Sequence, residues 1–597
     1  MKTSKNILIS LSIYFFIRIF SYLFHPQTPL WSQSPTNSLL SLLILILAAY
    51  LIYKKDERGW YIVAGEIILG GSGGYLSIFG ISLRTCLLIT SLSIYFPQKL
   101  YNEKKEFFSK FKTEHYLILI LFTAAFFSAS NGLYHNHVRG NIISDLIPYF
   151  FLLYLFPLSE LWLSDKFRDL GKKAILAAIF GNAILILFTQ IGFSSEIFTL
   201  QDQYYHWYRD VALGKITDLN LHFYRLVLNE HLLLIPLTIY FIADIIKNKL
   251  NKINLLALFS LLFILTNNLT RIYLLALATG ILILFSFKKW KRWLVVSAVS
   301  TISFLVIFTT FHTIASRGQS LGLEFFGIRL QSIVAPQIED SSLSRIILLP
   351  KILEKIKTNL ILGSGTGDTV TIYSPVFKQN ITTTNFDWGY LEIWAEMGSI
   401  GLLIWIAFIF YTFYTIIKNK RKYNKQILSA VLVAFLIINI TSPALFHVFG
   451  TLLLIIFFTP VGLEYSHSAG GIIIGQNGKI ILVNNKKHFD WWTPPKGGIA
   501  ENETPLETAK REIFEETGLK NITYIKDLGY FYNLKSWDNK PYFKKNSMFL
   551  FKTTEISLSP QDSDNPEAKW FTIDEAINII QNTYYKNFII KTKHDLR

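Results

Sequence analysis

Residues 497–519 read GGIAENETPLETAKREIFEETGL, from Gly497 to Leu519, and this stretch decides the fold of the C-terminal part of the chain. Seven fixed residues and two aliphatic positions fit one ungapped pattern, G-x5-E-x7-R-E-U-x-E-E-x-G-U, where U is aliphatic. With average amino-acid usage, a chance match at a given position has a probability on the order of one in 10⁹. The spacing is therefore a strong signal of structure and chemistry.

The middle of this stretch carries the start and stop signals of a helix. Thr504 followed by Glu507 forms a capping box, and Pro505 suits the first helical position. Gly518 suits the position just past a helix end, where the backbone turns left-handed. We therefore expect one short helix between Thr504 and Gly518.

The surrounding sequence predicts strands and turns. Residues 471–475 and 479–483 are short β-prone runs separated by Gln476-Asn477-Gly478. Asn-Gly between two apolar runs is a strong hairpin signal. Further strands are expected near 523–532 and 547–553, and a final helix from about Asp574.

Three glutamates share one face of the predicted helix. Glu512, Glu515 and Glu516 stand at i, i+3 and i+4, so their carboxylates lie on the same side. Grouped carboxylates repel one another unless a hard divalent cation joins them, and Mg²⁺ accepts such oxygen ligands. The alternative is a capped amphipathic helix with a solvated charged face, which is what most charge runs are.

The complete spacing resembles the signature of the Nudix hydrolases, over about 466–597. The resemblance implies an α/β sandwich that hydrolyses a nucleoside diphosphate linked to another moiety. It also implies that the three glutamates bind Mg²⁺, with Mn²⁺ as the alternative ion, and serve catalysis with Arg511. Arg511 would orient the helix and its carboxylates by pairing with Glu503.

Nudix enzymes often draw a further acid from a loop after this motif. Glu567, three residues before Trp570, is the first candidate here, and Asp562 and Asp564 are the alternatives. The stretch Trp492-Thr-Pro-Pro-Lys496 is similar to that of members acting on dinucleoside polyphosphates, although substrate choice in this family lies in variable loops.

The rest of the chain has the composition of a membrane protein. Of 597 residues, 51% are hydrophobic and only 17% are charged, against about a quarter charged in soluble proteins. The net charge of +17 lies in short Lys and Arg clusters between long apolar runs within 6–463. This placement favours a lipid bilayer over nucleic acid as the partner. The single cysteine, Cys86, excludes an intrachain disulfide.

Apolar run length predicts about fourteen membrane spans in a domain covering 1–463, since a bilayer core needs about 20 apolar residues per helix. The first run has no small-residue cleavage site, so we interpret it as a span and not as a removed signal peptide. The predicted spans lie near 6–24, 37–53, 60–78, 81–97, 116–131, 143–163, 174–193, 226–246, 253–268, 271–287, 293–313, 398–417, 427–443 and 445–462.

Charge asymmetry predicts the orientation of these spans. Basic clusters fall on alternate loops, near 54–58, 99–112, 166–173, 247–252, 288–292 and 418–425. By the positive-inside rule these loops are cytoplasmic, so both termini and a C-terminal domain at 464–597 are expected in the cytoplasm. A long loop at about 314–397 then lies outside, and loops of this length are usually functional.

The membrane half resembles the O-antigen ligase and polymerase-like superfamily over about 1–460. The likeness rests on many apolar spans and one large loop before the last few. It also rests on Asn268-Leu-Thr-Arg271 at a helix start, and on Tyr390-Leu-Glu392 leading to Glu396-Met-Gly-Ser-Ile-Gly401. The resemblance implies transfer or polymerisation of a glycan carried on polyprenyl diphosphate, at the outer face of the bacterial cytoplasmic membrane.

Arginines are the candidate ligands of that lipid diphosphate. Ionisable groups in apolar runs are costly and usually face a cavity or a partner, and a guanidinium binds phosphate oxygens in a bidentate way. The candidates are Arg84, Arg225, Arg271 and Arg345. Each could instead pair with a carboxylate or reach the membrane interface. Where ligases of this superfamily place a histidine as base, this chain has Asp387, whose carboxylate can also accept a proton.

Together these patterns predict a polytopic α-helical membrane domain followed by an α/β Nudix domain, in one bifunctional enzyme. Two other functions stay open. The C-terminal domain could be a nucleotide sensor that regulates the membrane half, or the membrane half could be a transporter. The long outside loop fits a transferase better than a pore.

Overall fold

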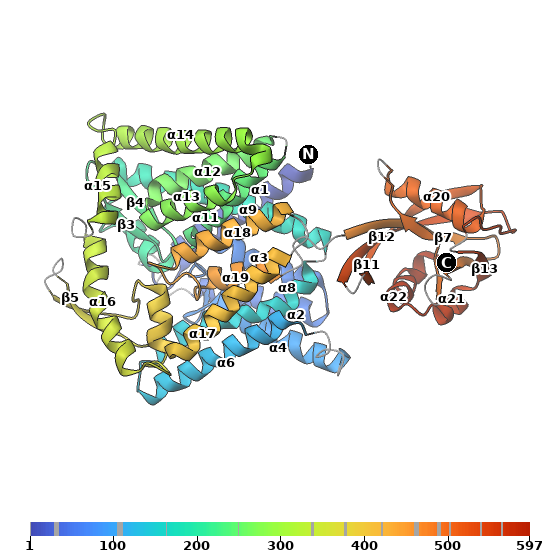
Figure 1. Ribbon diagram of the computed structural model, residues 1–597, viewed down its shortest axis with the longest axis horizontal. Helices are drawn as coiled ribbons and strands as arrows, with labels where there is room; N and C mark the ends of the chain where they lie inside the picture. Colours follow the sequence, from blue (N-terminus) through green and yellow to red (C-terminus); the bar gives the residue numbers. More distant parts are fainter. Residues whose placement is uncertain are drawn as a thin grey trace. The chain divides into compact units, whose positions relative to one another are not determined.

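The chain forms two compact units, Met1–Val461 and Gly462–Arg597 (Figure 1). The structure is a computed structural model. It describes residues 2–28, 35–103, 111–162, 164–248, 250–335, 340–374, 379–418, 422–458, 465–485, 491–500, 503–537, 540–562 and 565–596.

The first unit is built from apolar helices. Among the described residues, eight helices are long and apolar enough to cross a membrane, and four further apolar helices are shorter. The predicted count of about fourteen spans is therefore not confirmed. The helices are α1 Lys2–Phe24, α2 Thr36–Tyr53, α3 Glu57–Leu69, α4 Leu83–Glu103, α6 Thr113–Tyr134, α7 Arg139–Phe151, α8 Leu155–Leu161, α9 Asp165–Ser194, α10 Gln203–His206, α11 Leu234–Lys247, α12 Lys252–Asn268, α13 Arg271–Ile283, α14 Trp290–Ala315, α15 Leu323–Val334, α16 Asp340–Thr358, α17 Gly389–Lys418, α18 Lys422–Ile438 and α19 Val448–Phe458.

Three two-stranded hairpins interrupt these helices. They are β1 Ser77–Ile78 with β2 Ile81–Ser82, β3 Lys215–Asp218 with β4 Tyr224–Val227, and β5 Val370–Ser374 with β6 Gln379–Thr383. The first hairpin corrects the predicted span 60–78. Helix α3 ends at Leu69 because Gly71 and Gly73 take left-handed backbone angles, φ 53° and 86°, which a continuing helix excludes.

Large apolar side chains on the long helices are exposed. Leu43 in α2 is 65% exposed, Ile302 in α14 is 59% exposed and Leu403 in α17 is 63% exposed. Extensive exposed apolar surface is rare on proteins in water, whereas the interior of a bilayer is as apolar as leucine. The exposed faces therefore fit a protein that lies in a membrane.

Helix α17 is broken near its start. Gly398 has φ 66° and ψ −172°, which is not helical. A Cβ atom on Gly398 would lie 2.2 Å from the carbonyl oxygen of Ile361, so only glycine lets the chain pass this closely. The break separates a short first part of α17, which contains Tyr390 and Glu392, from the long apolar remainder.

The second unit is an α/β domain around one mixed sheet. The strand order is β11-β12-β7-β8-β13, with β10 paired to β7 and β9 to β8, and β12 runs parallel to β7. The strands are β7 Tyr465–Ile474, β8 Ile480–Asn485, β9 Trp491–Thr493, β10 Lys496–Gly498, β11 Ile522–Trp537, β12 Lys540–Thr553 and β13 Glu567–Phe571. The helices are α20 Pro505–Thr517, α21 Ile573–Ile579 and α22 Thr583–Thr592.

Helices cover both faces of this sheet (Figure 1). Ile473 belongs to an apolar cluster with Ile513 of α20, whereas its neighbour Ile472 belongs to a second cluster with Ile589 of α22. Successive side chains of a strand point to opposite faces, so the sheet separates two cores. Both clusters consist of residues of this unit alone, which lets it fold as an independent domain.

The local signals of the sequence are present in this domain. Thr504 Oγ1 accepts from the backbone N–H of Glu507 at 3.3 Å, and the Glu507 carboxylate accepts from the Thr504 N–H at 2.8 Å. Gly518 ends α20 with φ 77°. The predicted helix and its capping box are confirmed.

Candidate functional site

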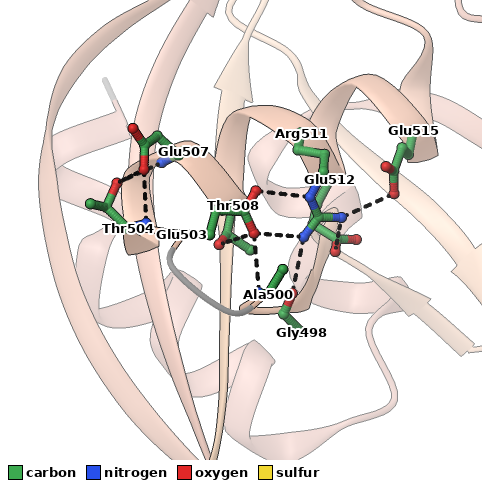
Figure 2. A network of polar contacts seen from close by, with 9 residues as sticks. All are labelled: Gly498, Ala500, Glu503, Thr504, Glu507, Thr508, Arg511, Glu512 and Glu515. Atoms are coloured by element: carbon green, nitrogen blue, oxygen red, sulfur yellow. Dashed lines mark hydrogen bonds and ion pairs between the residues drawn. The ribbon is translucent and has the colours of Figure 1, made fainter.

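Arg511 is the centre of a polar network on α20 (Figure 2). Its Nε and Nη2 donate to the two carboxylate oxygens of Glu503 at 2.9 and 3.0 Å. Its Nη1 donates to Glu512 at 2.7 Å and to Glu515 at 3.2 Å. Its Nη2 also donates to the carbonyl of Gly498 at 3.0 Å. One guanidinium thus ties the helix to the loop before it and holds two of the three glutamates.

Glu503 is a fixed acceptor in this network. Besides Arg511, it accepts hydrogen bonds from Thr508 Oγ1 at 2.8 Å and from the Ala500 N–H at 3.2 Å. The bonds from Arg511 and Thr508 lower the pKa of Glu503 to about 2. This carboxylate is therefore charged throughout the physiological range and keeps Arg511 in place.

Glu516 is the buried member of the three glutamates, only 4% exposed. Its Oε2 accepts from the backbone N–H of Lys496 at 2.8 Å, and its Oε1 accepts from Asn565 Nδ2 at 2.6 Å. Burial raises the pKa of Glu516 to about 8, against the charge of Lys496, and the neighbouring Glu512 and Asp562 raise it further. The carboxylate is held at a site that disfavours an isolated negative charge.

Glu512 is half-buried beside the first glycine of the motif. Burial raises the pKa of Glu512, while Arg511 lowers it and Glu515 raises it. A Cβ atom on Gly497 would stand 2.0 Å from the carboxylate carbon of Glu512, so a side chain at this position would displace the carboxylate. Glycine at position 497 therefore leaves the room that the Glu512 carboxylate occupies.

The donor set fits a divalent cation. Burial raises the pKa of both Glu512 and Glu516, and the charge of Glu512 raises that of Glu516 further. A cation between such groups relieves this repulsion. In the described part of the chain, no group of three or more His, Cys, Asp or Glu already surrounds one point. Arg511 instead holds two of the glutamates, so a bound cation would compete with this arginine for them.

Glu567, the predicted further acid, points to other partners. Its carboxylate pairs with Lys569 Nζ at 2.5 Å and accepts from Asn484 Nδ2 at 3.4 Å. The structure places Asn565 and Asp562 beside Glu516 instead, while Asp564 lies outside the described residues. We therefore do not retain Glu567 as the first candidate for the extra acid.

Sequence reasoning missed Lys496 and Asn565 at this site. Lys496 is half-buried, and its ammonium lies 4.9 Å from the centre of the Tyr585 ring. Lys496 directly precedes Gly497 of the motif, and this position could have indicated that Lys496 lies at the site. Asn565 carried no such signal, because its place depends on the path of the loop after β12.

The first unit contains a cavity of about 560 Å³ that brings together most of the predicted membrane residues. Arg225 comes from β4, Arg271 from the start of α13, Arg345 from α16 and Asp387 from the turn before α17. Residues that were not predicted as ligands also line it: Lys215, Arg329 and His447. Five cationic side chains and one carboxylate therefore share this cavity.

Hydrogen bonds fix two walls of this cavity. Arg225 donates from Nε to the Asn268 carbonyl at 2.8 Å and from Nη2 to Thr270 Oγ1 at 2.9 Å, so it is anchored at the junction of α12 and α13. On another wall, Trp388 Nε1 donates to the Arg345 carbonyl at 3.1 Å. This bond ties α16 to the turn that carries Asp387.

Asp387 has a left-handed backbone, with φ 56°. Its N–H donates to Asn385 Oδ1 at 3.0 Å. Aspartate and asparagine tolerate this conformation better than other residues with side chains. The turn places Asp387 among the residues that line the cavity.

Arg84 is not among the residues that line the cavity. Its Nε pairs with Glu66 at 2.9 Å, and its Nη2 donates to the Gly71 carbonyl at 2.8 Å. Both members of the ion pair are buried. Arg84 therefore pairs with a carboxylate, which was the alternative role considered for each arginine. We do not retain Arg84 as a diphosphate ligand.

Each of the two units contains a region that matches a known protein family. A family model for the NUDIX domain matches residues 464–590. The second unit is a Nudix domain. A family model named O-Antigen ligase matches residues 255–406, so the membrane unit carries an O-antigen ligase-like domain. Nudix hydrolases generally use a divalent metal ion, usually Mg²⁺.

Individual relatives match the Nudix domain. An RNA pyrophosphohydrolase of Bartonella henselae is 36% identical over 73 residues, 12% of this chain and 42% of that protein. Diphosphoinositol polyphosphate phosphohydrolase 2 of Rattus norvegicus is 30% identical over 108 residues, 18% of this chain and 56% of the relative. The chain thus spans about half the length of these two relatives. A solved C. elegans Ap4A hydrolase binary complex is 21% identical with a TM-score of 0.20, covering 22% of this chain and 97% of that one.

Proposed function

We propose that the Nudix domain hydrolyses a nucleoside diphosphate linked to another moiety, with Mg²⁺ as the metal ion and Mn²⁺ as the alternative. The observation that carries this proposal is the arrangement of three glutamates on α20, two of them held by Arg511 and the third buried at Glu516. When bound, the metal would polarise the diphosphate and activate water.

The chain's own groups have distinct roles in this proposal. Glu512, Glu515 and Glu516 hold the cation. Arg511, fixed by Glu503, orients the helix that carries them. Glycine at position 497 leaves room for the Glu512 carboxylate, and Glu512 and Glu515 would exchange their bonds to Arg511 for the cation.

The test is release of phosphate or nucleotide by fragment 464–597 with Mg²⁺. The substrates are nucleotide-sugars and dinucleoside polyphosphates. Glu516→Gln should abolish release, because it removes a carboxylate that would hold the cation. Glu575→Gln, a matched change at the cap of α21, should leave release unchanged. Absence of release from every substrate, or equal release by wild type and Glu516→Gln, contradicts the hydrolase proposal.

The same fragment separates an enzyme from a sensor. Nucleotide binding without turnover, together with nucleotide-dependent activity of the membrane unit in the full chain, would assign the Nudix domain a regulatory role. Turnover that depends on Glu516 would assign it the enzymatic role.

We further propose that the membrane unit transfers or polymerises a glycan carried on polyprenyl diphosphate. The cavity lined by Arg225, Arg271, Arg329 and Arg345 supports this proposal, because guanidinium groups bind phosphate oxygens strongly. Three of these arginines and Asp387 fall inside the region that matches the O-antigen ligase model. The cavity opens, in this proposal, to the outer face of a bacterial cytoplasmic membrane, with both termini in the cytoplasm.

The transfer step uses groups of this cavity. The Asp387 carboxylate accepts the proton of an acceptor hydroxyl, whose oxygen forms the new bond to the anomeric carbon of the glycan. The bond from that carbon to the diphosphate oxygen breaks, and the diphosphate leaves with the electron pair. The arginines stabilise the charge that develops on it.

Proteoliposomes that contain the full chain and a glycan-charged polyprenyl diphosphate test this step. Arg271→Gln should weaken carrier binding and transfer at least tenfold. Arg317→Gln, at an exposed arginine paired with Glu196, is the matched control. Unchanged transfer by Arg271→Gln, or movement of an uncharged solute through the membrane without any transfer, would contradict the transferase and favour the transporter.

A further inference from the structure

Asn565 lies against the glutamate site without belonging to the set of motif residues. Its side chain is buried, 5% exposed. Its Nδ2 donates to Glu516 Oε1 at 2.6 Å and to Asp562 Oδ2 at 2.8 Å. One amide nitrogen therefore bridges two carboxylates, which would otherwise repel each other.

The backbone beside Asn565 is attached to the end of α20. The N–H groups of Gln561 and Asp562 donate to the Glu515 carbonyl at 2.9 and 3.1 Å, and the Ser559 N–H donates to the Thr517 carbonyl at 3.0 Å. The Asn565 N–H in turn donates to the Asp562 carbonyl at 3.2 Å. The amide is thus carried by a loop that is held to the same helix as the glutamates.

A neutral amide has an advantage at this place. A lysine or arginine would neutralise Glu516, whereas an asparagine fixes the carboxylate and leaves its charge available to a cation. The Oδ1 atom of Asn565 is buried and is one of the polar atoms without a hydrogen-bond partner among the described residues. Unpaired buried acceptors are rare, so this oxygen is itself free to receive a donor or a cation.

We propose that Asn565 is a positioning residue of the Nudix metal centre, which holds Glu516 in the orientation that binds the divalent cation. The inference rests on the proposed metal-dependent function of this domain. It adds a residue outside the motif, on the loop after β12, to the machinery that sets the metal affinity. Groups that orient metal ligands typically change metal affinity by about 10- to 100-fold when they are lost.

Binding of Mn²⁺ alone to the full chain, followed by electron paramagnetic resonance, tests the proposal. The site counted is the one that Glu516→Gln removes. Asn565→Ala should weaken Mn²⁺ binding at this site by about 10- to 100-fold. Asn582→Ala is the matched control. It removes the cap of α22, where the Asn582 side chain accepts from the N–H groups of Tyr584 and Tyr585, and should leave Mn²⁺ binding unchanged.

Each outcome of this experiment either supports or overturns the proposed role of Asn565. If the wild type shows no Mn²⁺ site that depends on Glu516, the proposed function fails. If that site exists and Asn565→Ala binds Mn²⁺ as the wild type does, the role of Asn565 is overturned. Asn565→Ala could also lower the unfolding midpoint measured without metal. In that case, Mn²⁺ binding by an equally destabilised Asn582→Ala variant supports the proposal, because destabilisation alone does not remove the site. Loss of Mn²⁺ binding by this Asn582→Ala variant overturns the proposal. If Asn565→Ala does not fold, Asn565→Ser, whose side chain is too short to reach Glu516, takes its place.

Discussion

Gly497 lies so close to Glu512 that a Cβ atom on this glycine would stand 2.0 Å from the carboxylate carbon. Its neighbour Gly498 has no atom within 4 Å of the same constructed position. The two adjacent glycines therefore serve different purposes. A side chain at position 497 would collide with the Glu512 carboxylate, whereas a Cβ atom at position 498 would meet no other atom.

This difference predicts the effect of alanine at each position. Gly497→Ala should displace the Glu512 carboxylate and lower kcat/KM of the Nudix domain on the order of 100-fold, because small displacements of catalytic groups are that costly. Gly498→Ala should stay near the wild-type rate. Steady-state kinetics of the two variants, with the substrate found in the screen, measures the contrast. Similar rates for both would show that Glu512 can move without loss.

The ion pair of Glu503 with Arg511 predicts a pH dependence of stability. The pKa of Glu503 is lowered from 4.5 to about 2, so its contribution to stability is present above about pH 4.5 and is lost as pH falls towards 2. In fragment 464–597, Glu503→Gln should lower the thermal unfolding midpoint at pH 7, and the difference from wild type should shrink between pH 4.5 and 2. A difference that does not change across this window would contradict the assignment.

The capping box of α20 predicts a modest stability loss. Thr504→Ala removes the acceptor of the Glu507 N–H and should lower the free energy of unfolding by about 1 kcal/mol. Thr554→Ala, at an exposed loop threonine, should change it little. Denaturant unfolding of the two variant fragments provides the measurement, and equal midpoints would mean that the cap contributes nothing.

The left-handed turn at Asp387 allows the role of the Asp387 carboxylate to be tested without changing the backbone. Asparagine tolerates the same φ of 56°, so Asp387→Asn should keep the turn while removing the proton acceptor. We expect transfer to fall by about 10²- to 10⁴-fold while binding of the polyprenyl diphosphate carrier is retained. Asp218→Asn, on β3, is the control. Full transfer by Asp387→Asn would assign the base elsewhere in the cavity.

Local signals explain what could be predicted from the sequence. The helix α20 follows from Thr504, Glu507 and Gly518, because caps act on backbone groups a few residues away. The shared face of Glu512, Glu515 and Glu516 follows from helical spacing, whereas the pairing of Arg511 with Glu503 was implied by the family resemblance. Long apolar runs likewise predict membrane helices without any knowledge of their packing.

Features that depend on packing could not be predicted in this way. Arg84 is paired with Glu66 from another helix, and nothing near Arg84 in the sequence distinguishes it from Arg225 or Arg271. The partners of Glu567 depend on the pairing of β13 with β8, and those of Asn565 depend on the path of the loop before β13. The cavity takes residues from many separate elements, among them β3, β4, α13, α15 and α16, so Lys215 and Arg329 were not recognised as members.

Arg511 also bears on whether this domain folds before or after it binds a cation. Because its guanidinium holds Glu512 and Glu515, the carboxylates already have a cationic partner before any metal arrives. Small zinc domains, by contrast, stay unfolded until their ion is supplied. We therefore expect the domain to fold before it binds the proposed cation, and we expect a chelator to stop its proposed hydrolysis without unfolding it.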